Sequence, residues 1–208
     1  DGTFTLPAEM IDGDVSLEGI FIDAKTALTY EVYFNNEFVY STVVNGAKTG
    51  AVTIPEGLSR DYVELTADKQ TITSLPATVR INATWTAPMK VATPADTTWY
   101  NLKVSNQPRW VSSGNYTPNV YFIDETYITT DYALWALTGN PYSGFRLINK
   151  AMGPTMVLAS ASPKGSAKAG GNTYATLLPA DNLPAGYTSD WTVTISPNDD
   201  EGFYICNP

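Results

Sequence analysis

Short runs of alternating apolar and polar residues, separated by turn-forming residues, make up most of this chain. The run 79–85 has apolar residues at every second position, as expected for a strand with one buried face. The run 28–34 is apolar on both faces and predicts a central strand, and the polar segment 35–37 links it to the run 38–44 as a hairpin. No window has a helical period. The pattern predicts an all-β protein.

Two domains are expected, with a boundary in the segment 87–97. This segment contains Pro88 and Pro94, small residues and no strong alternation. Proline lacks a backbone N–H and restricts the residue before it, so such a segment ends strand pairing. The strand spacing in residues 1–90 predicts an Ig-like β-sandwich, with a β-grasp-like arrangement of these strands as the alternative.

The predicted second domain, residues 96–208, contains an internal repeat. Trp135–Asn149 and Trp191–Asn207 share one plan: Trp, an alternating strand, a Pro-containing turn, Gly-aromatic, a second strand and Asn. The end of the phrase occurs earlier as Leu102–Asn106. A supersecondary unit that recurs about three times indicates a repeat-built domain. The chain stops just after the last phrase, so the third unit is expected to be truncated, and the chain to belong to a longer polypeptide with further domains.

The repeated residues have expected structural roles. An alternating strand pair must bury its apolar face against another layer, which predicts core positions for the repeated aromatic residues Trp135, Phe145, Trp191 and Phe203. The Asn that ends each phrase is expected to turn the chain, either by Asx hydrogen bonding or by tolerating positive φ. These Asn residues are Asn106, Asn149 and Asn207.

The phrase Phe145-Arg-Leu-Ile-Asn149, with the Trp-led strand and turn before it, resembles the repeats of ricin-type β-trefoil lectin domains. Tyr30-Glu-Val-Tyr-Phe-Asn35 and Asn82-Ala-Thr-Trp85 resemble β-sandwich phrases that precede such regions in secreted multidomain proteins of glycan-degrading bacteria. The resemblance implies a β-sandwich followed by a β-trefoil-like domain with a carbohydrate-binding role.

Candidate ligand-binding residues follow from the chemistry of sugars. A flat aromatic side chain can cover the apolar face of a sugar ring, while carboxylate and amide groups bond its hydroxyls. Such residues fall in or beside the predicted loops of the second domain. The candidates are Trp110, Tyr116, Tyr121, Asp124, Asn140 and Tyr142.

Several function classes are disfavoured by composition. The chain has no His, which removes the commonest general base and zinc ligand, and its single Cys, Cys206, allows no internal disulfide. The net charge is −9 and the 12 Lys and Arg residues are scattered, which argues against nucleic acid and anionic membrane surfaces. No apolar stretch is long enough to insert into a membrane. No catalytic, metal-binding or cofactor motif is found; the Gly-rich segment 165–171 lacks the P-loop ending.

The sequence therefore predicts a non-catalytic, lectin-like carbohydrate-binding module, either secreted or on the cell surface, with glycans or glycoconjugates as partners. The alternative is a structural spacer or an adhesion module that binds another protein. Exposed aromatic residues clustered beside Asp or Asn would favour the lectin; buried aromatics would favour the spacer. An enzyme would need two carboxylates converging in one cleft.

Overall fold

The computed structural model describes residues 22–104, 107–114, 117–161, 175–195 and 203–206. Within these ranges the protein is all-β: the only helices are three-residue 3₁₀ turns. These turns are η2 (Glu56–Leu58), η3 (Glu125–Tyr127) and η4 (Asp131–Ala133). The predicted all-β class is confirmed.

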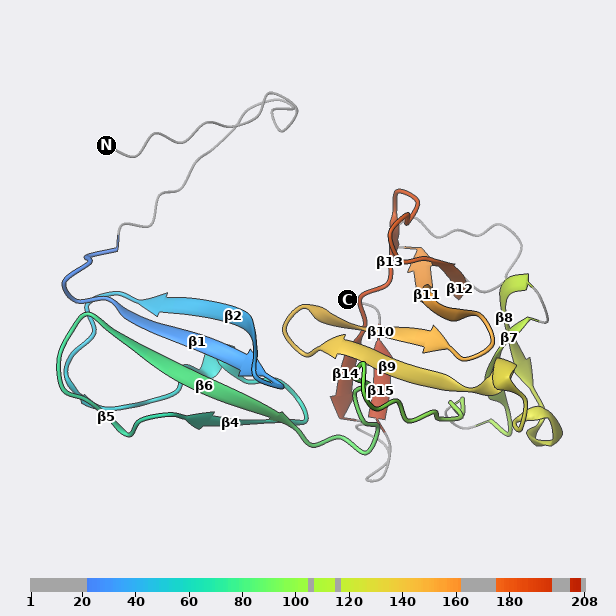
Figure 1. Ribbon diagram of the computed structural model, residues 1–208, viewed down its shortest axis with the longest axis horizontal. Coiled ribbons are helices and arrows are strands. Elements are labelled where there is room, and N and C mark those ends of the chain that lie inside the picture. The colour runs from blue at the N-terminus through green and yellow to red at the C-terminus, as the bar shows by residue number, and fades with distance from the viewer. Residues whose placement is uncertain (1–21, 105–106, 115–116, 162–174, 196–202, 207–208) are drawn as a thin grey trace.

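The first part of the chain forms a four-stranded sheet in the order β2-β1-β6-β4 (Figure 1). Its strands are β1 (Leu28–Phe34), β2 (Glu37–Val44), β4 (Val63–Ala67) and β6 (Ala77–Trp85). A second, two-stranded sheet pairs β3 (Gly50–Ala51) with β5 (Thr71–Ile72). Strand β1 pairs antiparallel with β2 and parallel with β6, so the predicted central strand and hairpin are confirmed.

The hairpin turn and the core follow from local sequence. Asn35 and Asn36 have φ of 50° and 66°, the left-handed pair that matches the twist of a two-residue hairpin and that Asn tolerates. Every second residue of β1 is buried, and β6 buries Val79, Ile81 and Ala83, as the alternation predicted. Leu58 of η2 belongs to the same core.

The second part of the chain forms a larger antiparallel sheet in the order β7-β8-β12-β11-β10-β9, with β13 paired to β11 and a separate β14–β15 hairpin (Figure 1). The strands are β7 (Trp110–Gly114), β8 (Thr117–Ile123), β9 (Trp135–Asn140), β10 (Gly144–Asn149), β11 (Gly153–Ala161), β12 (Ala175–Pro179), β13 (Tyr187–Thr188), β14 (Thr192–Ile195) and β15 (Phe203–Cys206). The domain limits 1–90 and 96–208 stay predictions.

Two segments that alternate like strands do not form strands. The described part of 98–105 makes only isolated bridges, because Tyr100 pairs with Trp135 on β9 whereas Lys103 pairs with Trp110 on β7. The segment therefore crosses from one partner to another. Residues 127–130 form the end of η3 and a turn, where the Thr130 N–H bonds the Tyr127 carbonyl. Alternation indicates a local preference for an extended backbone, but a strand also needs one neighbouring strand to which it hydrogen-bonds continuously.

The repeated phrases adopt equivalent structures. Each forms a hairpin, β9–β10 and β14–β15. In each, the indole N–H of the leading Trp donates to a backbone carbonyl at 2.9 Å, from Trp135 to Val111 and from Trp191 to Leu158. Trp135, Phe145 and Trp191 are buried in the second core, which confirms their prediction, while Phe203 is half-buried against it.

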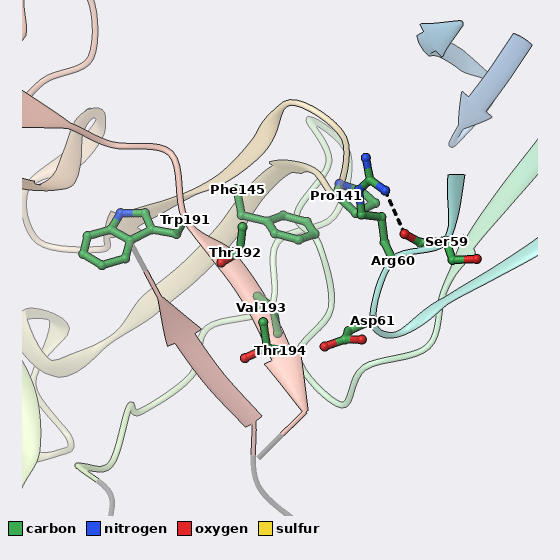
Figure 2. Close-up of a pocket in the computed structure, with 9 residues that line it drawn as sticks. All are labelled: Ser59, Arg60, Asp61, Pro141, Phe145, Trp191, Thr192, Val193 and Thr194. Atoms are coloured by element: carbon green, nitrogen blue, oxygen red, sulfur yellow. Dashed lines mark hydrogen bonds between the residues drawn. The ribbon is translucent and has the colours of Figure 1, made fainter. Parts of the chain in front are cut away.

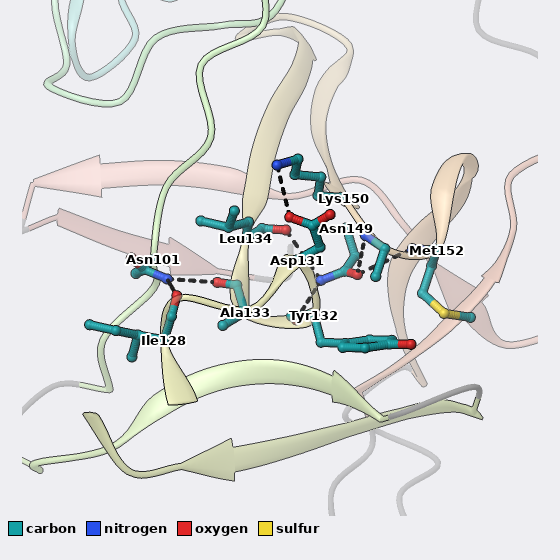
Figure 3. Close-up of polar contacts among 10 residues, drawn as sticks. Asn101, Ile128, Asp131, Tyr132, Ala133, Leu134, Asn149, Lys150 and Met152 are labelled. Carbon is teal, nitrogen blue, oxygen red and sulfur yellow. Dashed lines mark hydrogen bonds and ion pairs between the residues drawn. The ribbon is translucent and has the colours of Figure 1, made fainter. Parts of the chain in front are cut away.

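Asn149 closes its repeat by hydrogen bonding, as predicted (Figure 3). Its side chain is fully buried, and its Oδ1 accepts the backbone N–H groups of Ala151 at 3.1 Å and Met152 at 3.3 Å. Its Nδ2 donates to the carbonyls of Tyr132 at 2.8 Å and Leu134 at 3.2 Å. The side chain therefore ties the end of β10 to the η4 turn. Asn106 and Asn207 lie outside the described residues.

Candidate functional site

The two parts of the chain meet at a packed junction beyond the end of β6. Trp85 packs against Phe145 with ring centroids 4.8 Å apart and against Tyr62 at 6.0 Å. Its indole N–H donates to the Met89 carbonyl at 2.8 Å. Trp85 contacts both hydrophobic cores, so the segment after β6 is anchored where the two parts join.

The β9–β10 turn carries two of the predicted ligand residues, Asn140 and Tyr142, onto the first part of the chain. The side-chain Oδ1 of Asn140 accepts the backbone N–H of Tyr142 at 2.9 Å, which fixes the turn. The Tyr142 hydroxyl donates to the Leu58 carbonyl at 2.8 Å, and its ring stacks on Tyr40 at 5.9 Å. The Arg60 guanidinium lies 5.0 Å from the centre of the Tyr142 ring.

The electrostatics of Tyr142 favour this docked arrangement. Burial raises the pKa of the phenol above its ordinary value, and the nearby Arg60 cation opposes the shift. The phenol is therefore neutral at pH 7 and able to donate its proton to the Leu58 carbonyl. The structure thus gives Tyr142 and Asn140 contacts within the protein.

Beside this contact is a cavity of about 300 Å³, here called the junction pocket (Figure 2). Its floor is apolar, with buried Phe145, Trp191 and Val193 and half-buried Pro141. Its rim is polar and comes from both parts of the chain. The rim residues are Ser59, Arg60, Asp61, Thr192 and Thr194.

The rim charges are held in place by backbone groups. Arg60 donates through Nη1 to the carbonyls of Gly57 at 3.0 Å and Ser59 at 2.7 Å. Asp61 accepts the Ile195 N–H at 3.2 Å through one carboxylate oxygen. Among the described residues that line the pocket, Asp61 supplies the one carboxylate. The arrangement suits binding of a small polar molecule with an apolar face.

Three other predicted residues lie on the β7–β8 hairpin or directly after it: Trp110 on β7, Tyr121 on β8, and Asp124 between β8 and η3. This hairpin lies at the end of the molecule far from the first sheet (Figure 1). Trp110 is half-buried, with the Lys103 ammonium 5.8 Å from its ring centre. Tyr121 is 48% exposed. Asp124 forms an ion pair with Arg109, with Oδ1 and Nη1 2.7 Å apart.

Exposed aromatic residues concentrate where β8 ends. Phe122 is 55% exposed and Tyr127 is 60% exposed, so three large aromatic side chains, with Tyr121, reach solvent within residues 121–127. We call residues 121–127 the exposed aromatic segment. Asp124 lies in its centre, and the Asn119 side-chain amide donates to the Tyr121 hydroxyl at 3.3 Å. Of the described part of the chain, this segment best matches the pattern expected of a sugar-binding surface.

The six predicted residues do not form a single site. Asn140 and Tyr142 lie in the β9–β10 hairpin at the junction. Trp110 and Tyr121 lie on the β7–β8 hairpin, and Asp124 directly follows it. Tyr116 lies outside the described residues.

Sequence reasoning missed two groups of residues. Tyr127 lies in a run that alternates like a strand, whereas its exposure comes from a 3₁₀ turn. Arg60 and Asp61 gave only the weak signal of a charged pair after a turn, since their role depends on contact with a strand far along the chain.

No protein-family model, curated protein or solved structure matches this chain. In the part of the chain that the structure describes, no helix has the length and apolar character needed to cross a membrane. The same residues contain no group of three or more His, Cys, Asp or Glu side chains that could hold a metal ion.

Proposed function

We propose that this protein is a non-catalytic carbohydrate-binding protein, secreted or on the cell surface, that binds glycans through the exposed aromatic segment. The observation that carries the proposal is the exposure of Tyr121, Phe122 and Tyr127 within residues 121–127, close to Asp124 in sequence. Large aromatic side chains usually bury much of their area, so three that reach solvent within one short segment support a binding surface there.

The chemistry of this segment fits a sugar. The aromatic rings offer flat apolar area to the C–H face of a sugar ring. The Arg109 guanidinium holds Asp124 through Oδ1, which leaves the other carboxylate oxygen to accept a sugar hydroxyl. A carboxylate held in advance loses less side-chain entropy on binding than a free one. Stacking with a few directed hydrogen bonds is a shallow, non-catalytic mode of recognition.

The proposed fold supports this role. We propose an Ig-like sandwich for residues 1–90 and a β-trefoil-like repeat domain for residues 96–208. The observation in favour of the repeat is the pair of indole bonds made by Trp135 and Trp191, each from the start of a hairpin to an earlier strand. A domain built from such units places binding loops on a rigid scaffold.

The test is a glycan array followed by calorimetric titration of the best glycan. Tyr121→Ala and Tyr127→Ala are expected to weaken binding by about fivefold or more each, because a stacked aromatic contributes about 1 to 3 kcal/mol by analogy with bases on aromatic side chains. Phe38→Ala is the matched control, since Phe38 is 56% exposed but lies on β2. Wild-type protein that is folded and binds no glycan on the array would refute the proposal, as would full affinity in both Tyr variants.

A second candidate function, binding of another protein, is favoured by β2. This strand lies at the edge of the first sheet and exposes Phe38, Tyr40, Val43 and Val44. An edge strand with apolar side chains can accept a strand from a partner. Under this alternative Phe38→Ala weakens capture of a partner protein while both Tyr variants keep it, the reverse of the glycan result.

A further inference from the structure

We propose that the junction pocket is a second carbohydrate site, which takes a single sugar ring. This inference rests on the proposed function and adds a location and a ligand size to it. The two surfaces are separate, since the exposed aromatic segment lies on β8 and η3 whereas the pocket lies between η2, the β9–β10 turn and β14.

The pocket is formed in advance of binding. One wall, residues 59–61, follows η2, and the other comes from the β9–β10 turn and β14 (Figure 2). Two bonds join these walls: the Tyr142 hydroxyl to the Leu58 carbonyl at 2.8 Å, and the Ile195 N–H to the Asp61 carboxylate at 3.2 Å. Because the walls are already tied together, a ligand meets a preorganised cavity, which lowers the entropic cost of binding.

The charged rim has unused hydrogen-bonding capacity of both kinds. Arg60 bonds the backbone through Nη1, and among the described residues its Nε and Nη2 have no hydrogen-bond partner. Asp61 uses Oδ2 for Ile195, and within the same residues its Oδ1 has no partner. No ion pair joins Arg60 to Asp61 there either. A hydroxyl group can donate to the carboxylate or accept from the guanidinium, so a polyol satisfies both.

The placement of these groups favours a ring over a compact zwitterion. Figure 2 shows the Arg60 side chain pointing toward Pro141 and the Asp61 side chain pointing toward Thr194. An amino acid carries its two charges on neighbouring atoms, whereas a pyranose spreads its hydroxyls around its edge. The apolar floor of Phe145 and Val193 can take the C–H face of that ring. A cavity of about 300 Å³ is at the lower end of ligand pockets, which suits one ring rather than a chain.

The experiment is an NMR titration of the ¹⁵N-labelled chain with glucose, galactose, mannose and N-acetylglucosamine, each at millimolar concentration. The reporters are the backbone amides of Thr194 and Ile195. We expect at least one sugar to shift these signals saturably, and Asp61→Asn to weaken that binding at least tenfold. The Asn amide oxygen can still accept the Ile195 N–H, so the variant is expected to keep the junction. Asp96→Asn is the matched control, because Asp96 is exposed and away from the pocket, and we expect it to bind as the wild type does.

Each outcome decides the proposal. Saturable shifts at the junction that Asp61→Asn loses and Asp96→Asn keeps support it. The proposal is overturned if none of the four sugars shifts these signals, or if Asp61→Asn binds within twofold of the wild type. It is also overturned if glycine shifts these signals and the sugars do not. Array binding that depends on Tyr127, without any junction response, overturns this site and leaves the proposed function standing. A junction response with an unaffected Tyr127→Ala variant supports this site and refutes binding at the exposed aromatic segment.

Discussion

The buried Asn149 side chain offers the sharpest test of how the repeat is held together. Asn149→Asp keeps the oxygen that accepts from Ala151 and Met152 but removes the two N–H donors to the carbonyls of Tyr132 and Leu134. Neither carbonyl is left without a donor, since Leu134 still accepts the Lys150 N–H at 2.9 Å and Tyr132 still accepts the Ser113 hydroxyl at 3.4 Å. The cost comes from two lost hydrogen bonds, about 0.5 to 1.5 kcal/mol each, and from a buried carboxylate that faces two carbonyl oxygens, about 2 kcal/mol or more. We expect the free energy of unfolding to fall by at least about 3 kcal/mol, a large part of the 5 to 15 kcal/mol typical of a domain.

The assay is urea unfolding at pH 7, followed by tryptophan fluorescence, since Trp135 is buried in the adjoining core. Asn140→Asp is the control within the same hairpin. The Asn140 side-chain oxygen accepts from Tyr142 and Ser143 at 2.9 Å, which a carboxylate also does. Within the described residues its amide donates only to the Ser143 hydroxyl, at 3.3 Å. A loss below about 1 kcal/mol in Asn149→Asp, or an equal loss in the control, would refute the reasoning.

Two further predictions concern the junction and the hairpin that reaches it. Gly144 has φ of +97°, and a Cβ there would lie 2.8 Å from the Asp190 Cβ, so Gly144→Ala should lower the free energy of unfolding in urea by at least about 2 kcal/mol. Gly153 has φ of +85° but open space around it, so Gly153→Ala should lower the free energy of unfolding clearly less. Equal losses in the two variants would contradict a steric cause. Tyr142→Phe removes the bond to Leu58 and should cost about 1 kcal/mol at pH 7. Burial raises the pKa of this phenol in the folded state, so the phenol stabilises the fold fully below its unfolded-state pKa of about 10, and this contribution is lost as the pH rises through the folded-state pKa. The free energy of unfolding, measured from pH 9 to 12, should therefore fall less steeply in Tyr142→Phe than in the wild type. An equally steep fall would argue against this linkage.

Local chemistry accounts for much of the first sheet. The polar pair Asn35 and Asn36 between two strand-forming runs predicts the hairpin because Asn adopts the left-handed conformation that a two-residue turn needs. Alternation in β6 predicts its buried face because successive side chains point to opposite sides of a strand. Both features depend on neighbours in sequence, which explains why they could be predicted.

The repeat shows where sequence reasoning succeeds and where it ends. The shared phrase predicts two equivalent hairpins with buried Trp135 and Trp191, since the same pattern of apolar residues must be buried in the same way. The bonds from these indoles to Val111 and Leu158 join segments far apart in sequence. Their partners depend on how the strands are arranged, which the phrase does not encode.

The candidate sites also show which features follow from local sequence and which depend on tertiary contacts. The sequence by itself determined the all-β class, the hairpins, the core aromatic residues and the Asn149 turn, because these follow from side-chain alternation and local hydrogen bonding. Only the tertiary structure decided that Tyr142 docks at the junction, that Tyr127 reaches solvent from a 3₁₀ turn, and that Asp61 meets β14. Exposure and long-range contact are properties of the packed chain, since each depends on which distant segments exclude water from a side chain.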